Sequence, residues 1–253
     1  MKGFLLDMDG VVYRGGKPIP EALRFLSILQ KRKIPYLLLT NHGCLTPSGF
    51  SKKLAHMGIR VPPAQIYSSA EATAEWLKQR KVRRVFAIGE QGVFQALRKH
   101  GIRTSEKRVN HVVVGLDRKL TYEHLKTACN LISDGAHFIG TNPDTSYPIE
   151  YGYAPECGAL LAAVQSATGK APTIIGKPSA AIFRQAAHRL GLPVKQLTMI
   201  GDRLDTDILG AQRAGARSII VLTGHTTRAM LRENSIRPDQ VVAGLDELIE
   251  FLE

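Results

Sequence analysis

Two carboxylates, Asp7 and Asp9, stand two residues apart near the start of the chain, directly after the apolar run at residues 4–6. The run predicts a short buried strand, and residues two apart in an extended chain point to the same side. Gly10 follows, where the backbone can turn without a clash. Carboxylates that share a pocket repel each other unless a cation or a proton lies between them. The pair therefore predicts either a site for a hard metal ion or two acids with divided roles, one ionised and one able to carry a proton.

A surface turn of the Asp-x-Asp-Gly type would carry the same residues, so the isolated pair leaves both interpretations open. A second acidic cluster, with Asp202, Asp205 and Asp207, follows another apolar run at residues 197–200. In a parallel α/β sheet, ligands collect at the carboxyl ends of the strands. The two clusters are therefore expected to share one site.

Two further strand ends carry polar groups of a different kind. Thr40 and Asn41 follow the apolar run at residues 36–39, and Lys177 stands just before a predicted helix. The whole set offers carboxylates for a divalent cation, a hydroxyl and amides for anion oxygens, and one cationic counter-charge. That inventory suits a phosphoryl group, whose oxygens need donors and positive charge and whose metal needs hard oxygen ligands.

Strand and helix patterns alternate from end to end of the chain, which predicts an α/β protein with a doubly wound, mainly parallel sheet. In the terminal segments we expect strands at 4–6, 36–39, 66–67, 197–200, 218–222 and 240–242, and helices at 21–33, 47–56, 70–81, 179–190, 205–214 and 246–252. The middle block repeats the alternation, with strands at 85–88, 111–114 and 137–139 and helices at 92–99, 122–133 and 156–167.

The acidic clusters lie near the two ends of the chain, and the middle block carries none. An insertion is the economical explanation. We predict a catalytic core domain formed by residues 1–75 and 176–253, interrupted by a smaller α/β cap domain of residues 76–175, with boundaries placed to within several residues.

The composition is that of a globular protein, since 44% of the 253 residues are hydrophobic and 22% are charged. No apolar run approaches the ~20 residues of a bilayer span, and the apolar start is too short for a signal peptide. We therefore expect a cytoplasmic protein with no membrane partner. The three cysteines, Cys44, Cys129 and Cys157, show no Cys-x-x-Cys spacing and are expected to be reduced thiols.

The formal net charge of +12 could indicate nucleic-acid binding. The lysines and arginines are, however, scattered over helical faces without interleaved aromatic residues, so we predict no nucleic-acid partner. A positive field that attracts small anions is the milder functional interpretation. Homo-oligomer formation is left open.

Four segments together resemble the motifs of the haloacid dehalogenase superfamily of phosphohydrolases. They are Asp-x-Asp-Gly-Val at residues 7–11, Thr-Asn at 40–41, Gly-Lys-Pro at 176–178 and Gly-Asp-x-x-x-x-Asp at 201–207. The Thr-Asn-Pro-Asp segment at 141–144 and the large insertion between Thr40 and Lys177 resemble class IIA, the NagD-like or p-nitrophenylphosphatase-like group. The resemblance covers essentially the whole chain and implies a Rossmann-like core with an inserted α/β cap.

The resemblance implies a role for each acid. Asp7 would be the nucleophile that forms an aspartyl-phosphate, and Asp9 the general acid and then the base that activates water. Mg²⁺ would be held by the Asp7 carboxylate, the Asp9 backbone carbonyl and Asp202. Asp207 would bind a water on the metal rather than the metal itself.

The resemblance also implies contacts to the substrate. Thr40, the Asn41 amide and Lys177 would hold the phosphoryl oxygens, and Asn142 and Asp144 would belong to a substrate loop of the cap. An anionic nucleophile is repelled by an anionic phosphate, so a cation and Lys177 must offset that repulsion.

Two features depart from the motifs or leave alternatives open. His42 and Gly43 stand where the family commonly has Asn-Ser, so His42 either tunes the leaving-group region or is a loop histidine with no chemical role. Three tyrosines, at 147, 151 and 153, follow the 141–144 segment. They indicate either a loop packed by its own side chains or a lid over the phosphate site.

The function that these inferences favour is a magnesium-dependent phosphatase acting on a small phosphomonoester. The subclass implies a nucleoside monophosphate, a sugar phosphate or pyridoxal phosphate, and the residues alone do not choose among them. A phosphotransferase or mutase with the same aspartyl-phosphate chemistry is the first alternative. A non-enzymatic phospho-acceptor switch is the second, because such proteins also combine acids, a threonine and a lysine.

Overall fold

The computed structural model describes residues 2–149 and 151–250. The chain divides into two compact units. The core unit comprises Met1–Thr40, Ser48–Tyr67 and Lys177–Glu253, and the inserted unit comprises Asn41–Pro47 and Ser68–Gly176. Among the residues described, no helix combines the length and apolar character that a bilayer span requires.

A six-stranded sheet with the order β15-β14-β13-β1-β4-β5 forms the centre of the core unit. Its strands are β1 Gly3–Leu6, β4 Tyr36–Thr40, β5 Ile66–Ser68, β13 Leu197–Gly201, β14 Arg217–Val221 and β15 Gln240–Val242. Strand β1 pairs in parallel with both β13 and β4. From β1 the chain continues to β4 and β5 on one side of β1, and it later adds β13, β14 and β15 on the other side. The strand order therefore reverses between β1 and β13, which is the switch point of this doubly wound sheet.

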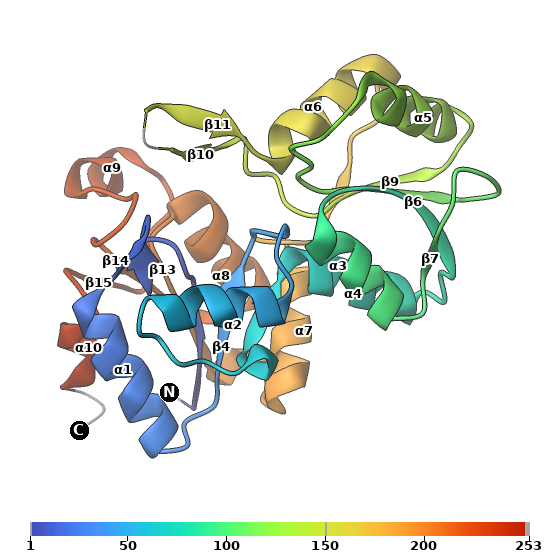
Figure 1. Cartoon of the computed structure of the whole chain (residues 1–253). Coiled ribbons are helices and arrows are strands. Elements are labelled where there is room, and N and C mark those ends of the chain that lie inside the picture. Colours follow the sequence, from blue (N-terminus) through green and yellow to red (C-terminus); the bar gives the residue numbers. More distant parts are fainter. Residues whose placement is uncertain (1, 150, 251–253) are drawn as a thin grey trace. The chain divides into compact units, whose positions relative to one another are not determined.

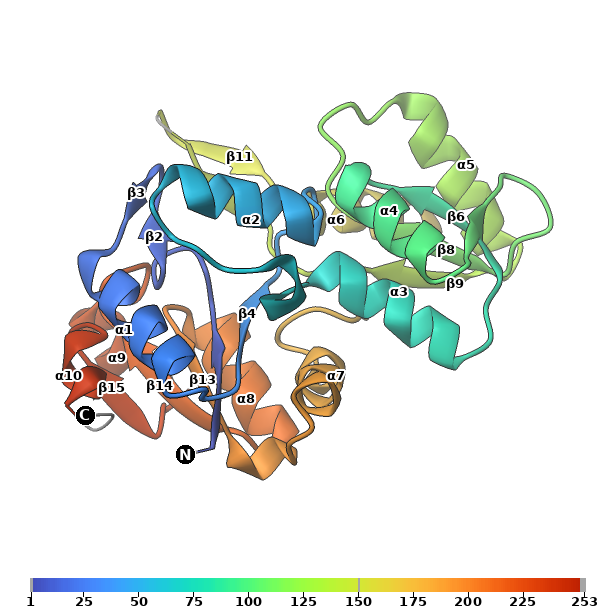
Figure 2. The same ribbon diagram turned by 60° about the horizontal axis from the view of Figure 1, so that its bottom comes forward.

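Helices cover this sheet. They are α1 Pro20–Lys31, α2 Pro47–His56, α7 Ala180–Leu190, α8 Leu209–Ala214, α9 Arg228–Glu233 and α10 Asp246–Ile249. The α1–α10 pair and the α7–α8 pair lie on different sides of the strands (Figure 2). Phe25 of α1 packs edge-on against Phe4 of β1, with ring centroids 5.6 Å apart, and both rings are buried. A small hairpin, β2 Tyr13–Arg14 with β3 Lys17–Pro18, follows β1.

The inserted unit has its own sheet, with the order β12-β9-β8-β6-β7. All its pairs are parallel, and its strands are β6 Arg84–Ile88, β7 Arg103–Thr104, β8 His111–Val114, β9 His137–Gly140 and β12 Thr173–Ile174. Its helices are α3 Ser69–Gln79, α4 Gln91–Lys99, α5 Tyr122–Ser133 and α6 Cys157–Thr168. Strands β6 and β9 lie between the α3–α4 and α5–α6 pairs (Figure 1). An antiparallel hairpin joins β10 Ser146–Pro148 to β11 Tyr153–Pro155.

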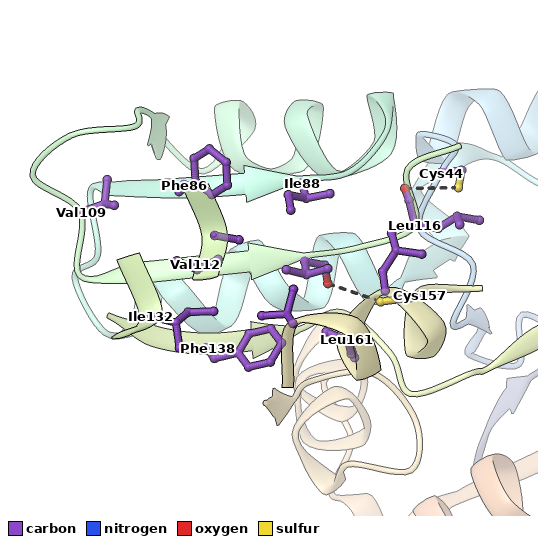
Figure 3. Packing of buried hydrophobic residues seen from close by; sticks show 14 residues of the cluster. Cys44, Phe86, Ile88, Val109, Val112, Leu116, Ile132, Phe138, Cys157 and Leu161 are labelled. Atoms are coloured by element: carbon purple, nitrogen blue, oxygen red, sulfur yellow. Dashed lines mark hydrogen bonds between the residues drawn. The ribbon is translucent and has the colours of Figure 1, made fainter. Parts of the chain in front are cut away.

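Buried aliphatic and aromatic side chains from β6, β8, β9, α5 and α6 form the core of the inserted unit (Figure 3). Val112, Phe138 and Leu161 are among them. Cys44 and Cys157 lie in the same cluster, and all three cysteines of the chain are free thiols. The sulfur of Cys157 lies 3.4 Å from the Val114 carbonyl oxygen, so it packs as a small buried side chain with a weak donor.

The predicted α/β class with mainly parallel sheet is confirmed, and helices α2 and α5 have the predicted bounds. The helix predicted at 205–214 is instead a π-helical turn, Leu204–Ile208, followed by α8. The predicted helix 246–252 is observed as α10 up to Ile249, and residues 251–252 lie outside the described residues. The short strands β2, β3, β7, β10, β11 and β12 were not predicted, because their two or three residues show no apolar run or alternation.

The compact units differ in detail from the predicted domains. The predicted boundary between residues 75 and 76 would fall inside α3, all of which belongs to the inserted unit. Residues 41–47 also belong to that unit. The assignment of residues 76–175 to a cap domain stays a prediction.

Candidate active site

Asp7 and Asp202 lie at the carboxyl ends of β1 and β13, the two strands that flank the switch point. Leu6 stands in register with Ile200, and the Asp7 N–H donates to the Ile200 carbonyl oxygen at 2.9 Å. One carboxylate oxygen from each of Asp7, Asp202 and Asp207 lies within 4.8 Å of the other two. The structure therefore brings the two predicted acidic clusters together.

The π-helical turn Leu204–Ile208 directs Asp207 inward. Asp207 is completely buried, and its Oδ2 accepts the Arg203 N–H at 3.1 Å. Asp205 lies in the same turn but pairs with the Arg203 guanidinium at 2.6 Å, and its side chain is 61% exposed. The i→i+5 turn thus separates the two acids, and π-turns of this kind are frequent at functional sites.

Lys177 supplies the positive charge at the centre of this cluster. Its ammonium group donates to Asp7 Oδ1 at 2.6 Å, to Asp207 Oδ1 at 2.7 Å and to the Leu39 carbonyl oxygen at 3.1 Å. Burial lowers the pKa of Lys177, but the carboxylates of Asp207 and Asp7 more than offset that effect, so its pKa lies above the ordinary value. Lys177 is therefore a permanent cation that ties β1, β4 and the π-helical turn together.

The acids outnumber this lysine. Burial raises the pKa of Asp7 although Lys177 opposes the shift, and burial raises that of Asp207 to about 6. The pKa of Asp202 lies well above its ordinary value because of burial and then because of the Asp7 and Asp207 carboxylates. Buried carboxylates in surplus over their counter-charge are the electrostatic signature of a site for a divalent cation.

Asp9 differs from these acids because it is exposed to solvent. Desolvation by the surrounding protein raises its pKa, and the Lys53 ammonium opposes that shift. Lys53, on α2, donates to the Tyr13 hydroxyl at 3.2 Å and lies 4.3 Å from the centre of the Tyr13 ring. The structure thus places an acid that can exchange protons with solvent two residues after the buried Asp7.

Thr40 and Asn41 are neighbours in sequence but belong to different compact units. Thr40 is buried at the end of β4, one residue after the carbonyl that accepts from Lys177. The Asn41 carbonyl oxygen accepts from Ser69 Oγ at 2.5 Å and from Asn142 Nδ2 at 2.9 Å, all within the inserted unit.

Asp144, the second predicted residue of the substrate loop, also contacts Asn41. The Asn41 side-chain amide donates to Asp144 Oδ2 at 3.1 Å. The Asp144 N–H in turn donates to Asn142 Oδ1 at 3.0 Å. Asn142 and Asp144 therefore hold Asn41 within the inserted unit, and their contact with a substrate stays a prediction.

His42 and the tyrosines take different positions within the inserted unit. His42 Nδ1 lies 3.9 Å from Oε1 of Glu156, whose pKa is raised to about 7 by burial and then by the Asp144 carboxylate. Tyr147 packs against the hydrophobic core, whereas Tyr151 and Tyr153 are 86% and 77% exposed. The tyrosines therefore do not pack together as one cluster.

The loop at residues 223–226, which follows β14, was not predicted to take part in the site. The His225 N–H donates to Asp202 Oδ2 at 2.7 Å, and Thr223 Oγ1 donates to the Gly10 carbonyl oxygen at 2.6 Å. The contact to Asp202 comes from a backbone N–H, so no residue type in the sequence indicates it. The loop could have been predicted from its position, because it follows a strand that lies beside β13 and so starts at the same edge of the sheet.

Two family models match this chain. Residues 4–103 match the model described as haloacid dehalogenase-like hydrolase, and residues 174–248 match the HAD-hydrolase-like model. The 5'-nucleotidase YutF of Bacillus subtilis is 36% identical over 252 residues, which cover 99% of this chain and 98% of that protein. The dihydroxyacetone phosphatase of Corynebacterium glutamicum is 37% identical over 248 residues, which cover 98% and 90% of the two chains.

Solved structures agree with these sequence matches. The 4-nitrophenylphosphatase of Thermotoga maritima superposes with a TM-score of 0.95 at 34% identity and covers 100% of this chain and 98% of its own. NagD of E. coli K-12 has a TM-score of 0.93 at 31% identity, with 98% of each chain covered. The chain belongs to the haloacid dehalogenase-like hydrolase family, in its NagD-like group. The predicted family and the predicted class of enzyme, a hydrolase of this superfamily, are confirmed.

Proposed function

We propose that this protein is a magnesium-dependent phosphatase that hydrolyses a small phosphomonoester through an aspartyl-phosphate on Asp7. One observation carries the proposal: the Lys177 ammonium lies between Asp7 and Asp207 in a buried cluster that Asp202 completes. A nucleophilic carboxylate and an anionic phosphate need such positive charge beside them.

The residues present fit Mg²⁺. Three buried carboxylates offer the hard oxygen ligands that this ion prefers. The carboxylates of Asp7 and Asp202 and the backbone carbonyl of Asp9 would hold it, and Asp207 would bind a water on it. When bound, Mg²⁺ supplies positive charge that stabilises the negative charge on the phosphoryl oxygens.

The chemistry of the chain's own residues divides into two halves. In the first, a carboxylate oxygen of Asp7 forms a bond to phosphorus, the bond from phosphorus to the leaving oxygen breaks, and Asp9 donates a proton to that oxygen. In the second, Asp9 takes a proton from water, the water oxygen bonds to phosphorus, and the bond to Asp7 breaks. Lys177, which donates to Asp7 Oδ1 in the free protein, would orient that carboxylate before the attack.

The remaining predicted contacts complete the proposal. The Thr40 hydroxyl, the Asn41 amide and Lys177 would bind phosphoryl oxygens, and Asn142 and Asp144 would contribute to substrate contacts through their loop. Two of the relatives are named as a 5'-nucleotidase and a dihydroxyacetone phosphatase. These names support a small phosphate ester, and a nucleoside monophosphate or a sugar phosphate is the substrate class that we propose to test first, with pyridoxal phosphate next.

Phosphoryl transfer to a second substrate and a phospho-acceptor switch use the same aspartyl-phosphate. The solvent exposure of Asp9 favours hydrolysis, because a base open to solvent can activate water. Release of inorganic phosphate in repeated turnovers excludes a switch, and an unchanged phosphate yield in the presence of added alcohols excludes transfer. The cytoplasmic location and the absence of a nucleic-acid partner stay predictions, and the oligomeric state stays open.

The experiment is phosphate release from p-nitrophenyl phosphate and a panel of metabolite phosphates, with Mg²⁺ and with a chelator. We expect turnover with Mg²⁺ and none with the chelator. Asp7→Asn should abolish turnover. Asp205→Asn, which changes the exposed acid of the second cluster, should retain turnover. Turnover by a folded Asp7→Asn variant would refute the assignment of the nucleophile.

A further inference from the structure

The loop at residues 223–226 contacts two segments that carry proposed Mg²⁺ ligands. It follows β14, which pairs with β13 in parallel so that Gly201 stands in register with Ile220. The loop therefore emerges beside Asp202, which is the residue after Gly201. All the contacts described below lie within the core unit.

The first contact fixes Asp202. The His225 N–H donates to Asp202 Oδ2 at 2.7 Å, and the Thr226 N–H donates to the Asp202 carbonyl oxygen at 3.1 Å. The Asp202 backbone and its carboxylate are thus bound by successive residues of one loop. Because Oδ2 accepts this bond, the carboxylate is held in one rotamer, with Oδ1 as the oxygen that we assign to the cation.

Two glycines, Gly10 and Gly224, leave room for the Asp202 carboxylate in this position. A Cβ on Gly224 would lie 2.1 Å from Asp202 Oδ2, and a Cβ on Gly10 would lie 2.3 Å from the same oxygen. Both distances are far below a van der Waals contact, so a side chain at either position would displace the carboxylate. The loop and the segment after β1 therefore enclose Asp202 from two sides.

The second contact fixes the backbone after Asp9. Thr223 Oγ1 donates to the Gly10 carbonyl oxygen at 2.6 Å, and the Gly10 N–H donates to the Tyr13 carbonyl oxygen at 2.7 Å. In a planar trans peptide, the Asp9 carbonyl points opposite to the Gly10 N–H. Bonds on both sides of Gly10 thus set the direction of the Asp9 carbonyl, which is a proposed ligand.

We propose that Thr223 and the loop that it begins position the Mg²⁺ ligands of the core unit. Thr223 orients the Asp9 carbonyl through Gly10, and the His225 N–H orients the Asp202 carboxylate. The inference rests on the proposed function, because it presupposes Mg²⁺ at this site. Mg²⁺ requires near-ideal octahedral geometry, so its affinity is sensitive to small displacements of a ligand.

The test measures Mg²⁺ affinity by calorimetry on the free protein, independently of turnover. Thr223→Val removes the hydroxyl and keeps the shape, and we expect Mg²⁺ to bind about 3- to 10-fold more weakly, the effect of one net hydrogen bond. Thr223→Ser keeps the donor and should bind Mg²⁺ as the wild type does. Thr227→Val is the matched control, since the Thr227 hydroxyl accepts the Met230 N–H as the N-cap of α9.

A second pair of variants tests the contact with Asp202. Gly224→Ala places a methyl group against the carboxylate and should lower Mg²⁺ affinity by at least about 10-fold, as expected for a displaced ligand of an ion with strict geometry. Gly16→Ala is its control, because a Cβ there meets nothing within 4 Å. Thermal unfolding without Mg²⁺ confirms that each variant folds, and the increase in Tm on adding Mg²⁺ reports affinity again.

The outcomes separate this inference from the proposed function. Weaker Mg²⁺ binding in Thr223→Val and Gly224→Ala, with Thr223→Ser and the controls unchanged, supports the inference. Wild-type affinity in folded Thr223→Val and Gly224→Ala variants overturns it and leaves the proposed function intact. A wild-type protein that binds no Mg²⁺ overturns both.

Discussion

The ammonium group of Lys177 lies 2.7 Å from Asp207 Oδ1, and the two side chains are only 2% and 0% exposed. Lys177 also contacts Asp7 at 2.6 Å, so one buried cation serves the proposed nucleophile and an acid of the second cluster. A buried charge that loses its partner is costly, because water is not there to replace it. This relationship makes Lys177 important for stability as well as for chemistry.

We expect Lys177→Met to lower the free energy of unfolding of the metal-free protein by about 3–5 kcal/mol, because buried carboxylates lose their counter-charge. Phosphate release should fall by at least about 100-fold, the usual cost of losing one electrostatic donor. Urea unfolding and a phosphate assay measure the two effects. Lys170→Met, at an exposed position after α6, is the control, and equal behaviour of the two variants would contradict this account.

Lys53 should set the pH at which Asp9 loses its proton. The Lys53 ammonium lowers the pKa of Asp9, so Lys53→Met should raise that pKa. The protonated form, which acts as general acid, then persists to higher pH. The alkaline limb of the pH–rate profile is therefore expected to move upwards. Lys52→Met, one residue away and exposed, should leave the profile unchanged, and the idea fails if both variants retain the wild-type limb.

Glu156 should make the inserted unit less stable as the pH rises. In the folded protein, burial and then the Asp144 carboxylate raise its pKa from 4.5 to about 7, and its Oε2 has no hydrogen-bond partner among the described residues. Between these two pH values the folded state binds more protons than the unfolded state, so the free energy of unfolding falls with increasing pH.

Glu156→Gln removes this titration. Relative to the variant, the wild type should lose up to about 3 kcal/mol of stability between pH 4.5 and pH 7, as the shift in pKa implies. Urea unfolding at a series of pH values measures the difference. Glu123→Gln, whose side chain is 70% exposed, should show no such trend. A stability difference between wild type and Glu156→Gln that stays constant with pH would rule out the proposed titration.

Asn142 should stabilise the segment that contains Asn41. It is completely buried, donates to the Asn41 carbonyl oxygen at 2.9 Å and accepts the Asp144 N–H at 3.0 Å. Asn142→Ala leaves polar groups without these partners, and we expect a loss of about 1–3 kcal/mol in the free energy of unfolding. Asn130→Ala, exposed on α5, should cost much less, and denaturant unfolding of both variants decides the point.

The positions of the acids were predictable because strand ends in a parallel sheet converge. Asp7 and Asp202 follow apolar runs that became β1 and β13, and the switch point lies between those two strands. Lys177 was predictable as a counter-charge for the same reason. The ion pair with Asp207 was not, since it depends on a π-helical turn that resembles an ordinary helix in sequence.

Several hydrogen bonds of the site could not be predicted from the sequence. The His225 N–H that binds Asp202 belongs to the backbone, and backbone donors are the same at every residue except proline. Asn41 was expected to act together with Thr40, but nothing in the sequence indicated its hydrogen bonds with Ser69, Asn142 and Asp144, which are distant in sequence. Such contacts follow from tertiary packing and not from local periodicity.

The central claim is that Asp7 carries the phosphoryl group. Asp9→Asn keeps the nucleophile but removes the base that activates water, so a phosphorylated enzyme should accumulate with p-nitrophenyl phosphate, whose leaving group needs no proton from a general acid. Mass spectrometry of this variant after exposure to substrate is the most direct test. We predict one added phosphoryl group on the peptide that contains Asp7, labile to hydroxylamine and missing when Asp7 is also changed to Asn. A phosphoryl group on another residue, or none while phosphate is still released, would contradict the account.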